Sequence, residues 1–263
     1  IYYSSLMAGS KFFSDPRTIA TAQGGISGKM AYMKAIDDNS NIVAEVAQAK
    51  GTGASGIKMY AYLSNNEVVK IVEEAKRQNI AVWSHAALQI AKPSEIISSG
   101  VISISHSELL IYEKFPKKED VPTNWKGANA VNMTAEFWEE EYDKLGLDKI
   151  FELMKQYDVV LDATLSVYEP DKNLENSHWR YEMEKRITRD ANKAGVKVAA
   201  GSDSDQTTFV QYEMKLLVNE AGFTPFEALV SATKNSAQAT GIIKNHGTIE
   251  VGKKANLLFL NSN

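Results

Sequence analysis

The sequence predicts an α/β fold, specifically a (β/α)8 TIM-type barrel. Strand-like runs alternate with amphipathic helical segments, and the conspicuous polar residues lie at the carboxyl ends of different strands. Strands that alternate with helices pair in parallel, with the helices packed outside. A doubly wound sheet is the alternative, but the glycine-rich stretch at 22–29 does not follow a strand, as its phosphate-binding turn would. Because strand ends converge on one mouth in a barrel, the barrel is favoured.

Six apolar runs predict the strands of this sheet. They are enriched in β-branched and aromatic residues and are bounded by turn-forming residues. The runs span residues 1–7, 56–63, 81–86, 101–106, 159–165 and 196–204. We expect the last five to be parallel neighbours in chain order.

Capping boxes mark the start of two helices between or after these strands. Ser64 precedes Glu67 by three residues, and Thr224 stands in the same relation to Glu227, with Pro225 at the first helical position. Two further amphipathic helices are predicted at 41–51 and 146–157. After the last helix, residues 247–261 predict a hairpin, which is not stable alone.

Composition excludes several classes of function. The net charge of −4, the pI near 5.7 and the lack of a basic run argue against nucleic acid or an anionic membrane as partner. No apolar stretch in the sequence is long enough to span a bilayer. The absence of cysteine excludes disulfides and thiolate metal sites, and it leaves the compartment undecided between cytoplasm and periplasm.

A lysine interrupts the apolar run GIKMYAYL at 56–63. A buried ammonium is costly unless it is paired or loses its charge, so Lys58 lies either at the strand rim or in a site. His85 and His106 follow at intervals of about one βα unit, and Asp203 ends the last strand. Neutral imidazole and carboxylate suit a divalent metal such as Zn²⁺. A lysine amine freed of its proton by burial can condense with CO₂ to a carbamate, which is able to bridge two cations.

Each of these residues also has an ordinary structural explanation. A histidine after a strand is commonly a hydrogen-bonded core residue, and Asp203 in GSDSD commonly forms a turn. Their joint order on different strand ends favours a shared site. Two cations there would lower the pKa of a water molecule and polarise a scissile carbonyl group.

The ordered motifs resemble the amidohydrolase superfamily of metal-dependent hydrolases, in its imidazolonepropionase-like and prolidase-like branch. The resemblance runs from about residue 45 to the end, through GIKMY, VWSHA, ISISH, AAGSDS, TPFEALVSATKNSAQATG and GTIEVGKKANLLFL. It implies that Lys58 is carboxylated and bridges two metals, and that His85 and His106 are ligands. It also implies that Asp203 is both a metal ligand and the acceptor of the proton from the attacking water.

The sequence departs from this family at its start, where the family carries a His-x-His pair on its first strand. Neither His178, at an expected exposed helix start, nor His246, in a loop, is expected to replace that pair. With Lys58 on strand four, we expect the barrel at 1–243 to lack its first two strands. Residues 244–263 would be the C-terminal strands of a small composite β-sandwich.

The resemblance implies hydrolysis of C–N bonds in amide, peptide-like or cyclic amide substrates by a metal-activated water. One or two ions, most simply Zn²⁺, are expected, with two in a complete chain. Tyr60 and Tyr168 are candidates for contact with a small-molecule or dipeptide-like substrate, and the aromatic-rich segment 107–146 for a loop over the mouth. The alternative is a catalytically inactive or truncated barrel with a binding or structural role. Homo-oligomerisation is left open.

Overall fold

The fold centres on one eight-stranded sheet with the order β2-β3-β1-β4-β5-β6-β7-β8. The computed structural model describes residues 3–14, 25–114, 139–174, 177–203 and 209–261. Every neighbouring pair is parallel except β2 with β3. The strands are β1 (Ser4–Gly9), β2 (Lys29–Met30), β3 (Met33–Ile36), β4 (Gly56–Met59), β5 (Ala81–His85), β6 (Ser103–Ser105), β7 (Val160–Asp162) and β8 (Val198–Ala199).

The predicted strand order from β4 to β8 is confirmed, and β1 pairs with β4 as expected. β2 and β3 were not predicted. β3 pairs in parallel with the other side of β1, with Leu6 opposite Met33, so the chain order reverses at β1. Within the described residues the sheet is therefore an open arc with β2 and β8 at its edges.

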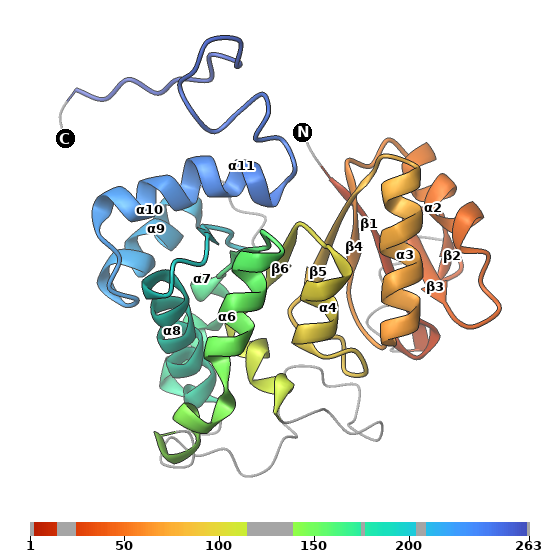
Figure 1. The fold of residues 1–263 in the computed structure, drawn as a ribbon, viewed down its shortest axis with the longest axis horizontal. Helices are drawn as coiled ribbons and strands as arrows, with labels where there is room; N and C mark the ends of the chain where they lie inside the picture. The colour runs from red at the N-terminus through yellow and green to blue at the C-terminus, as the bar shows by residue number, and fades with distance from the viewer. Residues whose placement is uncertain (1–2, 15–24, 115–138, 175–176, 204–208, 262–263) are drawn as a thin grey trace.

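The helices that connect the strands cover the outer face of this arc (Figure 1). Their bounds are α2 (Ile42–Gly51), α3 (Asn65–Arg77), α4 (Pro93–Ser99), α6 (Leu147–Gln156), α7 (Leu165–Tyr168), α8 (His178–Lys193), α9 (Phe209–Asn219), α10 (Pro225–Val230) and α11 (Ser236–Ala239). α2, α3, α4 and α6 contact one another in chain order. This is the arrangement of helices outside a barrel, whereas a doubly wound sheet carries helices on both faces.

Short 3₁₀ segments extend several connections, and they comprise η1 (Ser10–Ser14), η2 (Ser107–Glu113), η3 (Tyr142–Leu145) and η4 (Glu169–Asn173). A π-helical turn, η5 (Ser231–Asn235), joins α10 to α11. α7 contacts α8 and α9, α9 contacts α10, and α8 contacts β8, so these helices form one group (Figure 1). No described helix is long and apolar enough to cross a membrane.

Both predicted capping boxes are present. The Ser64 side chain accepts a hydrogen bond from the Glu67 amide while the Glu67 carboxylate accepts one from the Ser64 amide, and Thr224 and Glu227 do the same. The main core lies between the sheet and the helices, because Ile57, Ile104 and Leu161 are fully buried on the outward face. Alternate residues face the opposite side, as the period of a strand requires.

The interior of the arc is closed at its amino-terminal end by α11. The Ser103 hydroxyl donates to the Ala239 carbonyl at 3.1 Å. Ala239 also packs with Val160 and Ala199 in a small buried cluster inside the arc. The opposite, carboxyl-terminal end of the strands remains the mouth.

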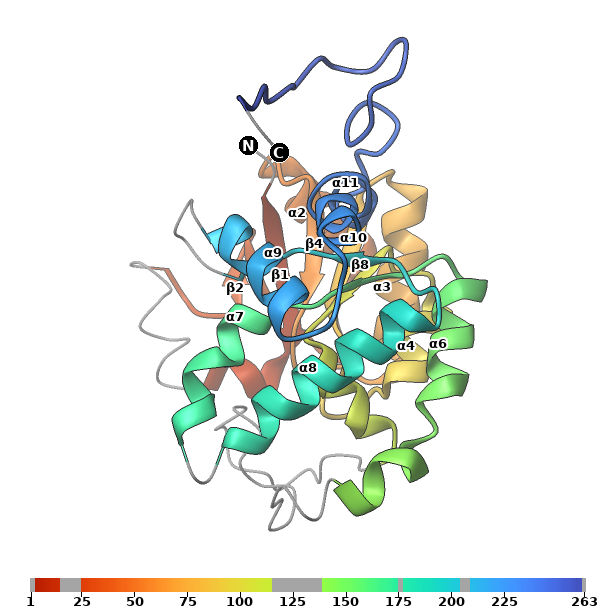
Figure 2. The same cartoon turned by 90° about the vertical axis from the view of Figure 1, so that its left-hand side faces the viewer.

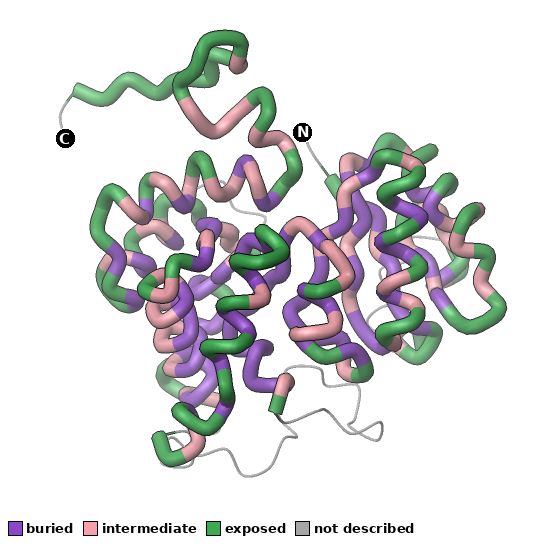
Figure 3. The backbone as a smooth tube through the Cα atoms, viewed as in Figure 1, coloured by how far each residue is buried: buried purple, intermediate pink, exposed green. Residues whose placement is uncertain are grey.

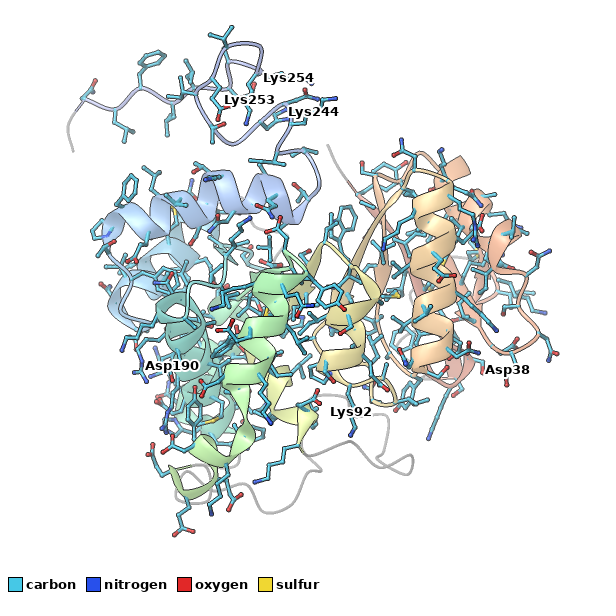
Figure 4. The ribbon with its side chains drawn as sticks, in the orientation of Figure 1. Asp38, Lys92, Asp190, Lys244, Lys253 and Lys254 are labelled. Atoms are coloured by element: carbon cyan, nitrogen blue, oxygen red, sulfur yellow. The ribbon has the colours of Figure 1, made fainter. Side chains whose placement is uncertain are left out.

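The C-terminal segment differs from the expected hairpin. Residues 244–261 contain turns and extended chain but no paired strand. Gly247 lies against Thr233 and Ala237. The rest of the segment stands away from the helices (Figures 1 and 2) and is mostly exposed (Figure 3), and Lys244 and Lys254 lie on its surface (Figure 4). An isolated pair of strands is marginally stable in water, which is consistent with the unpaired state.

Candidate active site

A cavity of about 400 Å³ lies inside the arc, in the size range of small-molecule sites. Inward-facing residues of consecutive strands line it, because each parallel strand contributes side chains to the same interior. From the mouth half of the arc these lining residues are Lys58, Trp83, Ser105, His106, Asp162, Thr164, Gly201 and Asp203. Three of the predicted site residues therefore meet in one cavity.

The Lys58 amine points into this cavity and away from bulk solvent. Nζ donates to the Ser105 hydroxyl at 2.9 Å and to the Ser84 carbonyl at 3.3 Å. Burial lowers the pKa of Lys58 to about 8, against the opposing attraction of the Asp162 and Asp203 carboxylates. A lysine with this pKa has an appreciable free-amine fraction near neutral pH.

Asp162, at the end of β7, belongs to the same site and was not predicted. Its Oδ2 accepts a hydrogen bond from the Ser105 hydroxyl at 3.3 Å, so the Ser105 side chain connects it to Lys58. Burial raises the pKa of Asp162, while Lys58 and the Gly201 amide oppose the shift. Its signal in the sequence was an acidic residue inside the apolar run VVLDATL, the same signal that identified Lys58.

His106 follows β6 and is almost completely buried, with φ 72° in the left-handed region. Nδ1 lies 2.8 Å from Thr164 Oγ1, and Nε2 lies 3.9 Å from Asp203 Oδ2. Burial holds the pKa of His106 well below its ordinary value, and the positive charges of Lys58 and Arg180 add to that effect. The imidazole is therefore neutral, the form in which it binds metals.

Asp203 stands at the mouth, with 59% of its side chain exposed. Its φ of 45° is also left-handed, a region that aspartate tolerates better than most residues. Loss of surrounding water raises the pKa of Asp203, and the Lys58 charge opposes this rise. The carboxylate is both open to the cavity and close to the His106 ring.

The remaining predicted residues form a row of rings beside the cavity. The centroids of Tyr60 and His85 are 4.3 Å apart, and those of His85 and His106 are 4.5 Å apart. Tyr168 lies on the other side of His106 at 5.9 Å and packs against the Arg180 guanidinium. None of three further predicted site residues lines the cavity in the described structure, namely His85, Tyr60 and Tyr168. Their roles as metal ligand or substrate contacts therefore stay predictions.

The two other histidines lie elsewhere. His178 begins α8, is 43% exposed and contacts Glu182, as expected of an exposed helix start. His246 lies in the segment after α11. Of the expected loop over the mouth, residues 115–138, including Trp125 and Trp138, lie outside the described part of the chain.

His106 and Asp203 present a nitrogen and an oxygen donor at a separation close to that of two ligands of one metal ion. Two ligands of one tetrahedral zinc ion are roughly 3.3 Å apart when each bond is about 2.0 Å. His106 Nε2 and Asp203 Oδ2, at 3.9 Å, need only a small displacement to meet this value. The described residues contain no group of three or more His, Asp or Glu side chains arranged around one point. The chemistry fits a divalent metal, which would require at least one further ligand.

Comparison with known proteins places these features in context. The profile of the Amidohydrolase family matches residues 19–263. Imidazolonepropionase of Pseudomonas fluorescens is 41% identical over 70 residues, which are 25% of this chain and 18% of that protein. The ochratoxinase of A. niger has a TM-score of 0.69 and 21% identity, over 96% of this chain and 57% of that one. A Xaa-Pro dipeptidase with bound methionine has a TM-score of 0.64 and 20% identity, over 96% and 60%. These two structures support the fold, and the chain spans less than two thirds of either.

Proposed function

The chain belongs to the amidohydrolase family, and we propose that it is a metal-dependent hydrolase of C–N bonds in small amide, peptide-like or cyclic amide substrates. One observation carries the proposal. The side chains of Lys58, His106, Asp162 and Asp203 converge on one cavity from four different strand ends. Such convergence at the carboxyl ends of barrel strands is typical of catalytic sites.

His106 and Asp203 would hold the divalent metal, with His85 and a carboxylated Lys58 as further ligands. Zn²⁺ suits imidazole and carboxylate donors, and the expected count is one or two ions. When bound, the metal supplies Lewis acidity at the scissile carbonyl and lowers the pKa of water. The sequence resemblance to the family and the proximity of His106 Nε2 to Asp203 support this assignment.

Carboxylation of Lys58 follows from the state of its amine. The free amine attacks CO₂, an N–C bond forms, and one N–H proton leaves to solvent, which gives a carbamate anion. The pKa of about 8 supplies the free amine that this reaction needs. Ser105, which already accepts a hydrogen bond from Nζ, would remain within the same polar pocket.

Asp203 would act as the base. Its exposed carboxylate at the mouth takes the proton of the attacking water and then delivers it to the departing nitrogen. An amide nitrogen is a poor leaving group until it is protonated, so this transfer controls bond cleavage. Tyr60 and Tyr168 are proposed to contact the substrate, because they flank the two histidines.

The test is hydrolysis of a defined panel by zinc-loaded protein. Xaa-Pro dipeptides and imidazolonepropionate represent the substrates after which similar proteins are named, and simple cyclic amides extend the panel. We expect cleavage of the C–N bond in at least one compound, with formation of a carboxylate and a new N–H group, and loss of that activity after chelation. Folded, zinc-loaded protein that leaves the whole panel intact would contradict the proposal.

The alternative is an inactive barrel that serves as a binding or structural protein. The absence of a three-ligand group within the described residues favours it. Metal analysis separates the two functions, because the hydrolase retains zinc after dialysis whereas the inactive barrel retains none.

A further inference from the structure

We propose that Thr164 is a positioning residue that fixes the tautomer of His106, so that Nε2 presents its lone pair to the cavity. The inference rests on the proposed function, since it concerns a histidine that would bind the metal. It assigns a role to a residue that lines the cavity and that was not among the predicted site residues.

The hydrogen bonds of the Thr164 hydroxyl determine the tautomer. Oγ1 donates to the Ala163 carbonyl at 2.6 Å and lies 2.8 Å from His106 Nδ1. A hydroxyl has one hydrogen, and a carbonyl oxygen can only accept. Donation to Ala163 therefore obliges Nδ1 to be the donor toward Thr164. In the opposite tautomer, with the proton on Nε2, the Thr164 hydroxyl would donate to Nδ1. Thr164 Oγ1 and the Ala163 carbonyl oxygen would then lie 2.6 Å apart with no proton between them.

This tautomer leaves the lone pair on Nε2, the nitrogen that lies toward Asp203. Histidines that bind metals usually donate their other N–H to a fixed acceptor, which sets the ring orientation and the basicity of the ligand. Thr164 supplies that acceptor from the turn between the neighbouring strand β7 and α7. It is fully buried, so water does not compete for the bond.

The backbone holds both partners of this bond in place. Thr164 has φ 65°, which is unfavourable for a β-branched residue. The two residues that follow, Leu165 and Ser166, donate their amides to the buried Glu213 carboxylate of α9 at 2.7 and 2.9 Å. Glu213 thus stabilises the turn that presents the Thr164 hydroxyl.

The turn at His106 is built in the same way. The amides of Ser107 and Glu108, directly after His106, donate to the buried Glu184 carboxylate of α8 at 3.0 and 2.6 Å. The same arrangement thus occurs on both sides of the His106–Thr164 hydrogen bond. On each side, a residue with positive φ is followed by two amides that donate to a carboxylate of an outer helix. This repeated support indicates a geometry that the fold maintains, because strained conformations persist only where their surroundings fix them.

The experiment measures the tautomer and zinc affinity of the whole chain. Two-bond ¹⁵N–¹H correlation spectra of zinc-free protein identify the protonated nitrogen of each of the four histidines, and His106→Gln assigns the His106 signal. We expect Nδ1–H in the wild type and in Thr164→Ser, which keeps the hydroxyl. Thr164→Val should lose this preference and bind Zn²⁺ about 10–100-fold more weakly, the usual effect of removing such a partner.

Thr188→Val is the matched control, since its buried hydroxyl bonds to Ser107 Oγ and not to an imidazole. Its tautomer and zinc affinity should match the wild type. A wild-type His106 protonated on Nε2 would overturn the inference, even if Thr164→Val fails to fold. Equal zinc affinity of folded Thr164→Val and wild type would also overturn it. Wild-type protein that binds no zinc would instead overturn the proposed function, while the tautomer measurement would still decide the role of Thr164.

Discussion

Asp203 combines a left-handed backbone with an exposed carboxylate beside His106 Nε2. Asparagine adopts the left-handed region as readily as aspartate does. An Asp203→Asn substitution therefore preserves the backbone and the shape of the side chain while it removes the basic site.

For Asp203→Asn we expect kcat to fall by at least ~100-fold, the effect of a lost general base, with KM little changed. The reason is that proton delivery to the leaving nitrogen contributes to the transition state and not to substrate binding. Steady-state kinetics of the zinc-loaded variant on a hydrolysed amide provide the measurement.

Asp158→Asn is the matched control, because Asp158 also has a positive φ, 56°, but pairs with Lys197 and Gln238 outside the cavity. It should keep the wild-type kcat. A folded, zinc-loaded Asp203→Asn enzyme with near-normal kcat would show that Asp203 only forms a turn.

Single residues differed in how well the sequence revealed them. The meeting of Lys58, His106 and Asp203 in one cavity could be predicted because a polar residue at the end of an apolar strand is conspicuous. Their chemical roles stay predictions. Thr164 carries no such signal, since its role depends on the pairing of β6 with β7, where Ser105 lies opposite Asp162. Sequence gives the alternation of a strand but not the register between two strands.

At the level of elements, β7 and the chain after β8 approach so closely that a side chain at 201 would displace the Asp162 carboxylate. A Cβ atom built on Gly201 would overlap the Asp162 carboxylate. Gly201→Ala should therefore reduce the free energy of unfolding by about 1–3 kcal/mol, the usual cost of overpacking. Denaturant unfolding measures this change.

Gly51→Ala is the control for the Gly201 substitution. Gly51 ends α2, and no atom lies within 4 Å of the position that a Cβ atom would take there. Alanine at this position should leave the protein equally stable or stabilise it by about 0.5–1 kcal/mol. Equal effects of the two alanines would show that Asp162 is not packed against Gly201.

The hydrogen bonds that the α7 amides donate to the Glu213 carboxylate of α9 predict that protein stability depends on pH. Burial raises the pKa of Glu213 to about 7 from an ordinary value of 4.5. The folded state thus binds a proton more tightly than the unfolded state, and stability from this group falls as pH rises from about 4.5 through 7. The unfolding free energy of the wild type minus that of Glu213→Gln should therefore fall by up to roughly 3 kcal/mol over that window.

Unfolding free energies of both proteins at a series of pH values test this linkage. Glu184 and the other buried acids titrate in both proteins, so the difference isolates Glu213 together with its repulsion of Glu184 and Asp162. A difference that stays constant from pH 4.5 to 8 would show that Glu213 does not take up a proton on folding.

Elements defined by local signals were predicted closely. Each capping box, at the start of α3 and of α10, involves residues only three positions apart in the sequence, and both are present as expected. β3 was missed because it has only four residues and includes Lys34, whose amine is paired with Glu45 of α2. A short strand with a charged residue has no distinguishing pattern until its partner is known.

For the whole molecule, alternation of strands and helices was sufficient to predict the parallel sheet and its helical cover. It was not sufficient for the reversal at β1, because pairing beyond neighbouring βα units depends on long-range contacts. The tail illustrates the same limit. Its alternating pattern predicted strands, yet Ile249, Leu258 and Phe259 are exposed in the structure. An apolar pattern specifies a strand only when another strand is available to pair with it.

The proposed hydrolase function depends on whether the cavity binds a catalytic metal. Calorimetric titration of chelator-treated protein with Zn²⁺ tests this most directly, with His106→Gln measured in parallel. We predict that the wild type binds at least one ion per chain and that His106→Gln loses most of this binding. A wild type that binds no zinc, or a His106→Gln variant that binds it equally well, would contradict the account.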